Sequence, residues 1–412
     1  MRLQKNVEVL HFNSKVVLAN RNNGTWIRIS EEVFTLLNEL FKADVDFIDE
    51  AMEFSDEEDR KYFKQVIDNM KQCYMLVDGK KYLEQDMANM IIFETTNRCN
   101  LHCAHCCMSA GEDEEKELST EAIKDILEKC IEWNPYFIAL SGGEPLFRKD
   151  FFEILQYLRD RFNGKIGLCT NGLLITNGNV DLICKNIDQI DISIDGVDEE
   201  SCSLYRGKGV FVKVVSAIKL LQSKGFTNIS LSMVFSDKNE NLEGAFTELN
   251  KMLGTKPVYR MLSEKGRAKE NKEILATTDY GESYVPESFI NGNSKDAPLG
   301  ASDCMAGKHS ILIRYNGDIY PCPTYVSHEE FCMGNIQRIN SIREVVGNNM
   351  HAAIKEQLYR TNKSNGESCH DCPVKLFCFS CPGDPQRFSS EESFQNYCNL
   401  SKPILMERVW GV

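Results

Sequence analysis

Short apolar runs alternate with amphipathic helical segments between residues 90 and 275. The runs are IIFETT, YFIAL, KIGLC, IDISI, ISLSMV and PVYRML. Between them lie segments such as TEAIKDILEKCIEW and VFVKVVSAIKLLQSKG, in which apolar residues recur with the period of a helix. Six strand-helix units are too few for an eight-stranded barrel. The pattern therefore predicts an α/β fold, a partial (β/α)6 barrel with its site at the C-terminal ends of parallel strands.

The first 88 residues follow a different pattern. VEVLHF and KVVLANR have the alternation of β-strands, and a turn at Asn22, Asn23 and Gly24 precedes the strand-like WIRI. Helical periodicity follows in SEEVFTLLNELFKA, which Ser30 is expected to cap, and in FIDEAM and EDRKYFKQVIDNMKQCYML. Strands followed by three short helices predict a small winged-helix-like domain.

The C-terminal third is rich in turn-forming residues and in cysteine. Residues 276–300 are rich in Gly, Ser, Asn and Pro, which places a domain boundary near residue 276. The remainder is loop-rich, so we expect metal or iron-sulfur clusters rather than a large apolar core to organise it. The predicted domains are thus 1–88, 89–275 and 276–412.

Composition narrows the possible partners. The 412-residue chain has a formal net charge of -14 and lacks the clustered basic residues that nucleic acids and anionic membranes require. The N-terminal MRLQKNVEVLHFNSKVV is interrupted by charges, and no apolar stretch is long enough to span a bilayer. We expect a cytoplasmic protein with neither a nucleic-acid nor a membrane partner.

Cysteine is the unusual component. Seventeen cysteines are far more than a typical cytosolic chain of this length contains. Disulfide-rich scaffolds are usually short and secreted, whereas clustered cysteines in a reducing compartment more often hold metals or iron-sulfur clusters. Cluster binding is therefore expected ahead of disulfides.

Three of these cysteines follow the first predicted barrel strand. The segment TTNRCNLHCAHCC places Cys99, Cys103 and Cys106 in one loop. Three thiolates can bind three irons of a 4Fe-4S cluster and leave the fourth iron for a small molecule. The alternative is a zinc loop, in which Cys107 or His102 supplies a fourth ligand.

This cysteine spacing resembles the radical S-adenosylmethionine (SAM) superfamily, and four other segments support the resemblance. SGGEP follows the second predicted strand and TNG the third, SIDG follows the fourth, and an arginine stands in YRGKGVF. The resemblance implies that Cys99, Cys103 and Cys106 hold the catalytic cluster, whose open iron takes the amino and carboxylate groups of SAM.

The same resemblance implies a set of SAM-binding residues. They are His105, Gly142, Gly143, Glu144, Asn171, Ser193, Asp195 and Arg206. Glu144 would accept a hydrogen bond from the SAM amino group, and Arg206 would pair with the SAM carboxylate. His105 stands where the family often has an aromatic residue; only its main chain is expected to touch adenine, and its side chain is expected at the surface.

The C-terminal cysteines resemble the SPASM extension of radical SAM enzymes, although their spacing alone also fits a zinc ribbon. By resemblance, a first auxiliary 4Fe-4S cluster would use Cys304, Cys322 and Cys381, and a second would use Cys369, Cys372, Cys378 and Cys398. Phe379 and Ser380 separate the last CxxC pair, where the family pattern has three residues. Cys332 could complete the first cluster, or its open iron could bind a substrate thiolate. The remaining cysteines, 73, 107, 130, 169, 184 and 202, are expected mostly to pack as small apolar residues.

The N-terminal domain resembles the recognition element of enzymes that mature ribosomally synthesised and post-translationally modified peptides (RiPPs). In such an element a leader peptide adds a strand to the sheet edge. A DNA-binding winged helix has a similar pattern. The frequent acidic residues between 31 and 59 disfavour DNA.

Together these resemblances predict a radical SAM peptide maturase, an oxidoreductase with one catalytic and two auxiliary 4Fe-4S clusters. A 5'-deoxyadenosyl radical would abstract hydrogen from a precursor peptide, with an electron supplied by flavodoxin or ferredoxin. The order of parts resembles thioether-forming sactipeptide and ranthipeptide maturases, one of which shares Gly266-Arg267-Ala268, and predicts a bond from a cysteine sulfur to carbon. Carbon-carbon crosslinking is the alternative. An iron-sulfur winged-helix transcriptional regulator is a more distant one.

Overall fold

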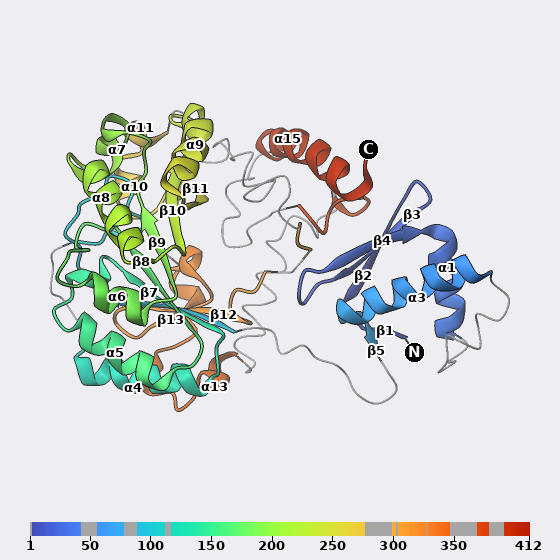
Figure 1. The fold of residues 1–412 in the computed structure, drawn as a ribbon, viewed down its shortest axis with the longest axis horizontal. Helices are drawn as coiled ribbons and strands as arrows, with labels where there is room; N and C mark the ends of the chain where they lie inside the picture. Colours follow the sequence, from blue (N-terminus) through green and yellow to red (C-terminus); the bar gives the residue numbers. More distant parts are fainter. Residues whose placement is uncertain are drawn as a thin grey trace.

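The described residues of the chain form three sheets (Figure 1). The computed structural model describes residues 2–42, 56–77, 89–111, 117–276, 299–301, 304–326, 328–346, 369–378 and 391–412. One sheet has eight strands, one has three and one has two. Among these residues, no helix is both long and apolar enough to cross a membrane.

The large sheet contains the six parallel strands expected from the sequence. They are β6 (Met90–Thr96), β7 (Phe137–Gly142), β8 (Lys165–Thr170), β9 (Gln189–Ser193), β10 (Ile229–Phe235) and β11 (Lys256–Met261). They lie side by side in chain order, and each neighbouring pair is parallel. The central parallel sheet is therefore confirmed.

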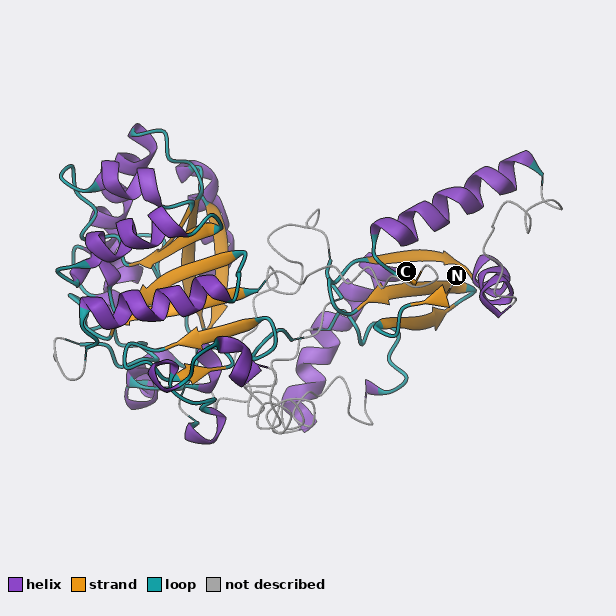
Figure 2. Cartoon of the chain, turned by 90° about the horizontal axis from the view of Figure 1, so that it is seen from below, coloured by secondary structure: helices purple, strands orange, loops and turns teal. Residues whose placement is uncertain are grey.

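Helices between these strands cover one face of the sheet (Figures 1 and 2). They are α4 (Thr120–Glu132), α5 (Phe151–Arg161), α6 (Val180–Asn186), α7 (Glu199–Arg206), α8 (Val210–Ser223) and α9 (Glu243–Leu253). Two short helices, α10 (Arg267–Glu270) and α11 (Lys272–Leu275), follow the last parallel strand. The 3-10 helices in the described residues are η1 (Pro145–Phe147), η2 (Glu240–Leu242), η4 (Pro323–Tyr325), η5 (Glu329–Phe331) and η6 (Ile336–Arg338).

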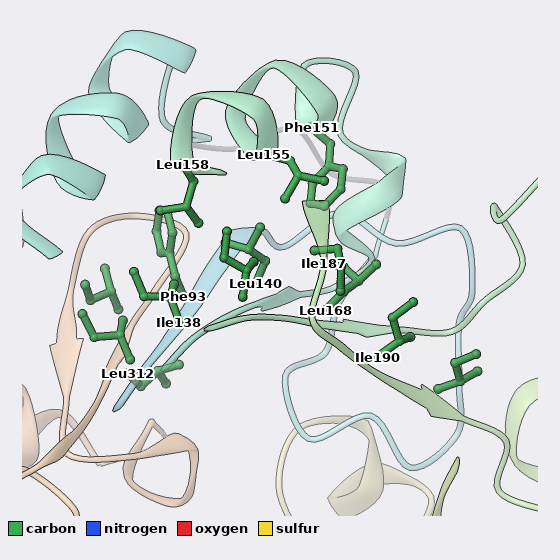
Figure 3. Packing of buried hydrophobic residues seen from close by; sticks show 14 of the residues in the cluster. Phe93, Ile138, Leu140, Phe151, Leu155, Leu158, Leu168, Ile187, Ile190 and Leu312 are labelled. Atoms are coloured by element: carbon green, nitrogen blue, oxygen red, sulfur yellow. The ribbon is translucent and has the colours of Figure 1, made fainter. Parts of the chain in front are cut away.

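The two faces of the large sheet differ because successive strand residues point to opposite sides. On the helix-covered face, Phe93, Leu140 and Leu168 pack in a continuous apolar core with Phe151 and Leu155 of α5 (Figure 3). The residues that alternate with them on the same strands, many of them small or polar, line a cavity. One face thus stabilises the sheet and the other is available for a site.

Two further strands extend this sheet beyond β6. Strand β12 (Ser310–Ile313) pairs with β6 in parallel, and β13 (Ile319–Tyr320) pairs with β12 in antiparallel orientation. Ile311, Ile313 and Tyr325 join the barrel core, as does the short helix α13 (Ile342–Val346) through Ile342. The expectation that clusters rather than an apolar core organise the C-terminal third is therefore wrong for this part, because β12 continues the apolar face of β6.

The N-terminal domain is a three-stranded antiparallel sheet with two described helices. Its elements are β2 (Val7–Phe12), β3 (Lys15–Asn20), β4 (Trp26–Ser30), α1 (Glu31–Lys42) and α3 (Glu57–Gln72), and the small pair β1 (Arg2–Leu3) and β5 (Leu76–Val77) joins its ends. Ser30 Oγ accepts a hydrogen bond from the Val33 amide at 3.2 Å, which confirms the expected cap of α1. The helix expected at 47–52 lies outside the described residues, and the winged-helix assignment stays a prediction.

Both faces of the N-terminal sheet are covered. Val16 and Leu18 of β3 pack against α1 and α3. Val17 and Ala19, which point the other way, pack against Trp410 in helix α15 (Glu391–Trp410), at the other end of the chain. The N-terminal domain therefore shares a core with the C-terminal segment.

Polar contacts reinforce this shared core. Lys15 Nζ donates to the Trp410 carbonyl at 2.9 Å, and Arg28 donates to the Val409 carbonyl at 2.7 Å. Both cations therefore bind carbonyls at the C-terminal end of α15, where the helix dipole favours positive charge. The Trp26 and Phe377 rings meet edge to face, with their centroids 5.1 Å apart.

Trp410→Ala tests the shared core. Trp410 is fully buried, so we expect its truncation to lower the free energy of unfolding by about 3–5 kcal/mol. Leu400→Ala is the matched control in the same helix, because Leu400 is 55% exposed and its loss should cost less than about 0.5 kcal/mol. Urea unfolding followed by circular dichroism measures both. Equal losses would contradict the shared core.

Candidate functional site

The cysteines of the CX3CX2C motif share one loop at the C-terminal end of β6. Cys99 and Cys103 are buried, Cys106 is half-buried, and all three are free thiols beside the cavity. The sulfur of Cys99 accepts a hydrogen bond from the Leu101 amide at 3.4 Å and lies 3.9 Å from the Asn171 side-chain nitrogen. Donors to the sulfur stabilise a thiolate ligand and tune the potential of a cluster.

The arrangement of these thiols bears on which metal they suit. Zinc needs its ligands within about 2.0–2.3 Å of a single ion. In the described part of the chain, no three His, Cys, Asp or Glu side chains converge in that way. An iron-sulfur cluster is larger, since each thiolate binds a different iron. Burial raises the pKa of Cys99 to about 11, so ligation would release its proton.

The two glycines of the SGGEP segment allow β7 to approach the cysteine loop. Gly142 has a φ of 138°, and a Cβ there would lie 2.2 Å from the Thr96 carbonyl oxygen. A Cβ at Gly143 would lie equally close, 2.2 Å, to the Arg98 carbonyl oxygen. Only glycine fits both positions, because larger residues would push away the backbone that leads into Cys99.

Glu144 joins two strand ends beneath the cavity. Its fully buried carboxylate accepts hydrogen bonds from Thr170 Oγ1 at 2.7 Å, the Asn171 amide at 2.7 Å and the Leu146 amide at 3.1 Å. Burial raises the pKa of Glu144 to about 7, although these donors act in the opposite direction. Glu144 therefore changes between its neutral and its ionised form near neutral pH.

Asp195 is the centre of a second buried polar cluster. It adopts a left-handed backbone conformation, with a φ of 51°. Its carboxylate lies 2.9 Å from His105 Nε2, accepts from Arg206 Nε at 2.5 Å and accepts from the Val234 amide at 2.6 Å. Burial acts to raise the pKa of Asp195, but Arg206 and His105 outweigh it and the pKa is lowered. Asp195 is thus a carboxylate, and the expectation of a surface side chain for His105 is wrong.

Arg206 links this cluster to the cysteine loop. Its side chain is one-tenth exposed, and its NH1 lies 3.9 Å from the sulfur of Cys103. Burial acts to lower the pKa of Arg206, but Asp195 and Cys103 raise it. Arg206 is therefore a fixed cation beside the cysteines. Ser193 Oγ, at the end of β9 and two residues before Asp195, lies 3.4 Å from Ser232 Oγ.

A cavity of about 760 Å³ brings the predicted residues together. It lies on the face of the large sheet away from the helices and has the size of typical small-molecule sites. Its wall includes the three cysteines and His105, Gly142, Gly143, Asn171, Ser193, Asp195 and Arg206. Glu144 lies behind this wall. The donor set, three thiols with a buried cation and hydroxyl groups, fits an iron-sulfur cluster together with a zwitterionic ligand.

Sequence reasoning missed the charged residues of the cavity floor. Arg260 donates to Asp191 at 2.5 Å, and Arg314 donates to Glu94 at 3.0 Å. Cys107 and Cys169 also line the cavity. A signal was present, because Glu94, Asp191 and Arg260 interrupt otherwise apolar strands at positions that point away from the core.

The C-terminal cysteines are only partly described. Burial raises the pKa of Cys378 to about 12, and Cys369, Cys372 and Cys398 are close enough to add to this effect. The Cys372 amide donates to the Cys369 carbonyl at 3.1 Å, and Cys372 and Cys378 pack against the same apolar cluster. Cys322 is half-buried and Cys304 exposed, Cys381 lies outside the described residues, and the Cys332 sulfur is 3.6 Å from the Gly334 carbonyl oxygen.

Two family models match the chain. The radical SAM superfamily model matches residues 93–247, and the model of the SPASM iron-sulfur cluster-binding domain matches residues 304–373. The first range contains the three loop cysteines and all the strand-end motifs. The second contains Cys304, Cys322, Cys369 and Cys372.

Relatives and solved structures agree with these models. Mycofactocin maturase MftC of Mycolicibacterium smegmatis is 30% identical over 263 residues, 60% of this chain and 67% of MftC. The AdoMet-dependent heme synthase of Methanosarcina barkeri is 33% identical over 328 residues, 71% of this chain and 90% of the synthase. Streptococcus suis SuiB, solved with SAM bound, superposes with a TM-score of 0.56 at 14% identity over 93% of this chain and 98% of SuiB, a likeness in fold.

The cysteine loop, the strand-end motifs, the matched family models and the extent of identity with relatives agree. The chain therefore belongs to the radical SAM superfamily: it is an enzyme that uses SAM and 4Fe-4S clusters, with a SPASM iron-sulfur cluster-binding domain after its barrel.

Proposed function

We propose that this enzyme matures a ribosomally synthesised precursor peptide. The observation that carries the proposal is an N-terminal domain built onto the cluster domain, beside a barrel with an open cavity. Superfamily membership alone leaves the substrate class undetermined, since a heme synthase is as similar to the chain as a maturase. The fold of SuiB supports a peptide as the substrate of this enzyme, because SuiB has also been solved with its precursor peptide SuiA and matches 91% of this chain.

The proposed catalytic centre uses the residues around the cavity. Cys99, Cys103 and Cys106 hold the 4Fe-4S cluster, and Arg206 and Glu144 bind the carboxylate and amino groups of SAM. Gly142, Gly143, Asn171 and Ser193 shape the same site, Asp195 orients Arg206, and the main chain of His105 contacts adenine. A 4Fe-4S cluster held there, with flavodoxin or ferredoxin as electron donor, would supply the electron for reductive cleavage of SAM to methionine and a 5'-deoxyadenosyl radical.

The N-terminal domain is the proposed leader-binding element. Among the described residues, β2 and β4 each pair with β3 alone, so each leaves an edge to which a peptide strand could add. Acidic side chains on α1 and at the start of α3 disfavour DNA. Because this sheet shares a core with α15, deletion of residues 1–88 would also expose apolar surface of the C-terminal segment. Leader binding is therefore better tested on the whole chain.

The proposed product carries a bond from a cysteine sulfur to carbon. Support comes from the cysteine pattern: the first auxiliary cluster, on Cys304, Cys322 and Cys381, has no fourth cysteine close to Cys304 in the sequence, and Cys332 is the ligand that would close it in the alternative. A substrate thiolate on its open iron would be held near the carbon radical and would give up the second electron to the cluster. The second auxiliary cluster, on Cys369, Cys372, Cys378 and Cys398, would pass that electron onward.

Substitution of the three loop cysteines tests the catalytic cluster. Reconstituted wild-type enzyme with dithionite should form 5'-deoxyadenosine. The variant Cys99→Ala/Cys103→Ala/Cys106→Ala should form none, because it lacks the three thiolates proposed to hold the cluster that binds SAM. The variant should keep the iron and sulfide of the auxiliary clusters. Chromatography of the products and iron analysis measure these results. Undiminished SAM cleavage by the triple variant would overturn the assignment.

The pH dependence of SAM binding tests Glu144. Its pKa of about 7 means that protons compete with the SAM amino group for the carboxylate. Affinity should fall as the pH drops below about 7, approaching tenfold per pH unit. Glu144→Gln should bind SAM more weakly at about pH 8 and lose this dependence. Equilibrium dialysis of the reconstituted enzyme between about pH 6 and pH 8 provides the measurement. If the variant shows the same pH dependence of SAM affinity as wild type, Glu144 does not contact the SAM amino group.

Mass spectrometry of the modified precursor tests the bond type. Thioether and carbon-carbon crosslinks both make the peptide lighter by two hydrogens, but only a thioether protects a cysteine from iodoacetamide after disulfide reduction. We expect one cysteine to resist alkylation for each crosslink formed. If all cysteines of a peptide lighter by two hydrogens are alkylated, carbon-carbon coupling is the reaction instead.

A further inference from the structure

A buried arginine beyond the residues that match the superfamily model contacts the cysteine loop from the last strand of the barrel. Arg267 follows β11 and is only 7% exposed. Its Nε donates to the Cys103 carbonyl at 3.0 Å, its NH1 donates to the Ala110 carbonyl at 2.7 Å, and its main-chain amide donates to the Cys106 carbonyl at 3.0 Å. One residue thus binds the loop beside two of the three proposed ligands.

The segment around Arg267 is shaped for this contact. Gly266 has a φ of 55°, and a Cβ there would lie 2.6 Å from the carbonyl oxygens of both Cys106 and Cys107. Asn271, one turn beyond Arg267, donates from its side chain to the Ala104 carbonyl at 3.1 Å. Only glycine lets the chain pass so close to the loop, and the amide of Asn271 binds a further loop carbonyl.

The charge of Arg267 has no protein counter-ion in the described part of the chain. Carbonyl groups accept its hydrogen bonds, but no carboxylate pairs with it there. Arg206, by contrast, is neutralised by Asp195 at 2.5 Å. A buried cation without an anion is costly, and among the described residues no carboxylate compensates the charge of Arg267.

The cluster proposed on the loop would provide that compensation. Its oxidised core is doubly positive, so three thiolate ligands leave one net negative charge, and reduction adds a second. A nearby buried cation therefore stabilises the reduced cluster more than the oxidised one.

We infer that Arg267 is the counter-cation of the catalytic cluster: it clamps the cysteine loop through the Cys103 and Ala110 carbonyls and raises the reduction potential of the cluster. This inference rests on the proposed ligation by Cys99, Cys103 and Cys106. Arg267 acts through the loop and through its charge, so it is a positioning residue and not a catalytic one.

Two substitutions separate the charge of Arg267 from its hydrogen bonds. Arg267→Gln keeps a donor for the Cys103 carbonyl but removes the charge, whereas Arg267→Lys keeps the charge and loses the planar fork. We expect Arg267→Gln to make the midpoint potential more negative by about 59 mV, which is a tenfold weaker one-electron reduction. Arg267→Lys should leave the potential near the wild-type value and lower cluster retention. Lys269→Gln removes an exposed charge from the same helix and should change neither.

The measurement is a redox titration of the anaerobically reconstituted full chain, followed by electron paramagnetic resonance of the signal that SAM perturbs. Loss of that signal from the triple cysteine variant identifies it as the catalytic cluster, and its persistence there would overturn the proposed ligation itself. Given that assignment, equal midpoints for wild type and Arg267→Gln, or equal shifts for the Gln and Lys variants, would overturn the role of the charge.

Thermal unfolding of the protein with and without clusters supplies an independent readout. Because the cluster compensates a buried cation, cluster loading should stabilise wild type more than it stabilises Arg267→Gln. The difference in unfolding temperature between the cluster-free and the loaded Gln variant should therefore be smaller than the same difference for wild type. An equal gain on loading in both proteins would contradict a counter-cation.

Discussion

Burial of two carboxylates, one just beyond the end of β7 and one just beyond the end of β9, is the constraint on which the site depends. Glu144 binds the Thr170 and Asn171 end of β8, and Asp195 binds His105 of the cysteine loop and Arg206 of α7. A buried carboxylate must be paired or protonated, so each draws several elements to itself. Because their surroundings differ, Asp195 is held as a carboxylate while Glu144 titrates near neutral pH. The cysteine loop is thus held from beneath by charge as well as by backbone hydrogen bonds.

The large sheet separates stability from chemistry by the alternation of its side chains. Its helix-covered face packs aliphatic and aromatic residues such as Phe93 and Leu168 into one core. Its other face presents smaller and charged residues to the cavity, with Asp191 and Glu94 paired to arginines. A substrate segment entering the cavity would meet polar groups without disturbing the core. Strand β12 extends both faces, which makes the start of the SPASM domain part of the barrel wall.

The two ends of the chain form one unit. Val17 of β3 and Trp410 of α15 share a core that also contains Phe377, next to Cys378. A peptide bound to the N-terminal sheet would therefore sit on the same structural unit as the proposed second auxiliary cluster. This gives a physical route by which binding of a leader could affect the cluster domain, since packed cores transmit displacement.

The sequence by itself determined the parallel strands, the cap of α1 and the grouping of cysteines, because these depend on local periodicity and spacing. It also indicated the strand-end motifs, since parallel strands bring their C-terminal ends to one edge. Only the tertiary structure decided that His105 is buried on Asp195, that Arg314 pairs with Glu94 and that Arg267 reaches Cys103. The last two contacts join residues 220 and 164 positions apart, so no local pattern could reveal them. Their partners are selected by the need to satisfy buried charge, which arises only when the chain has folded.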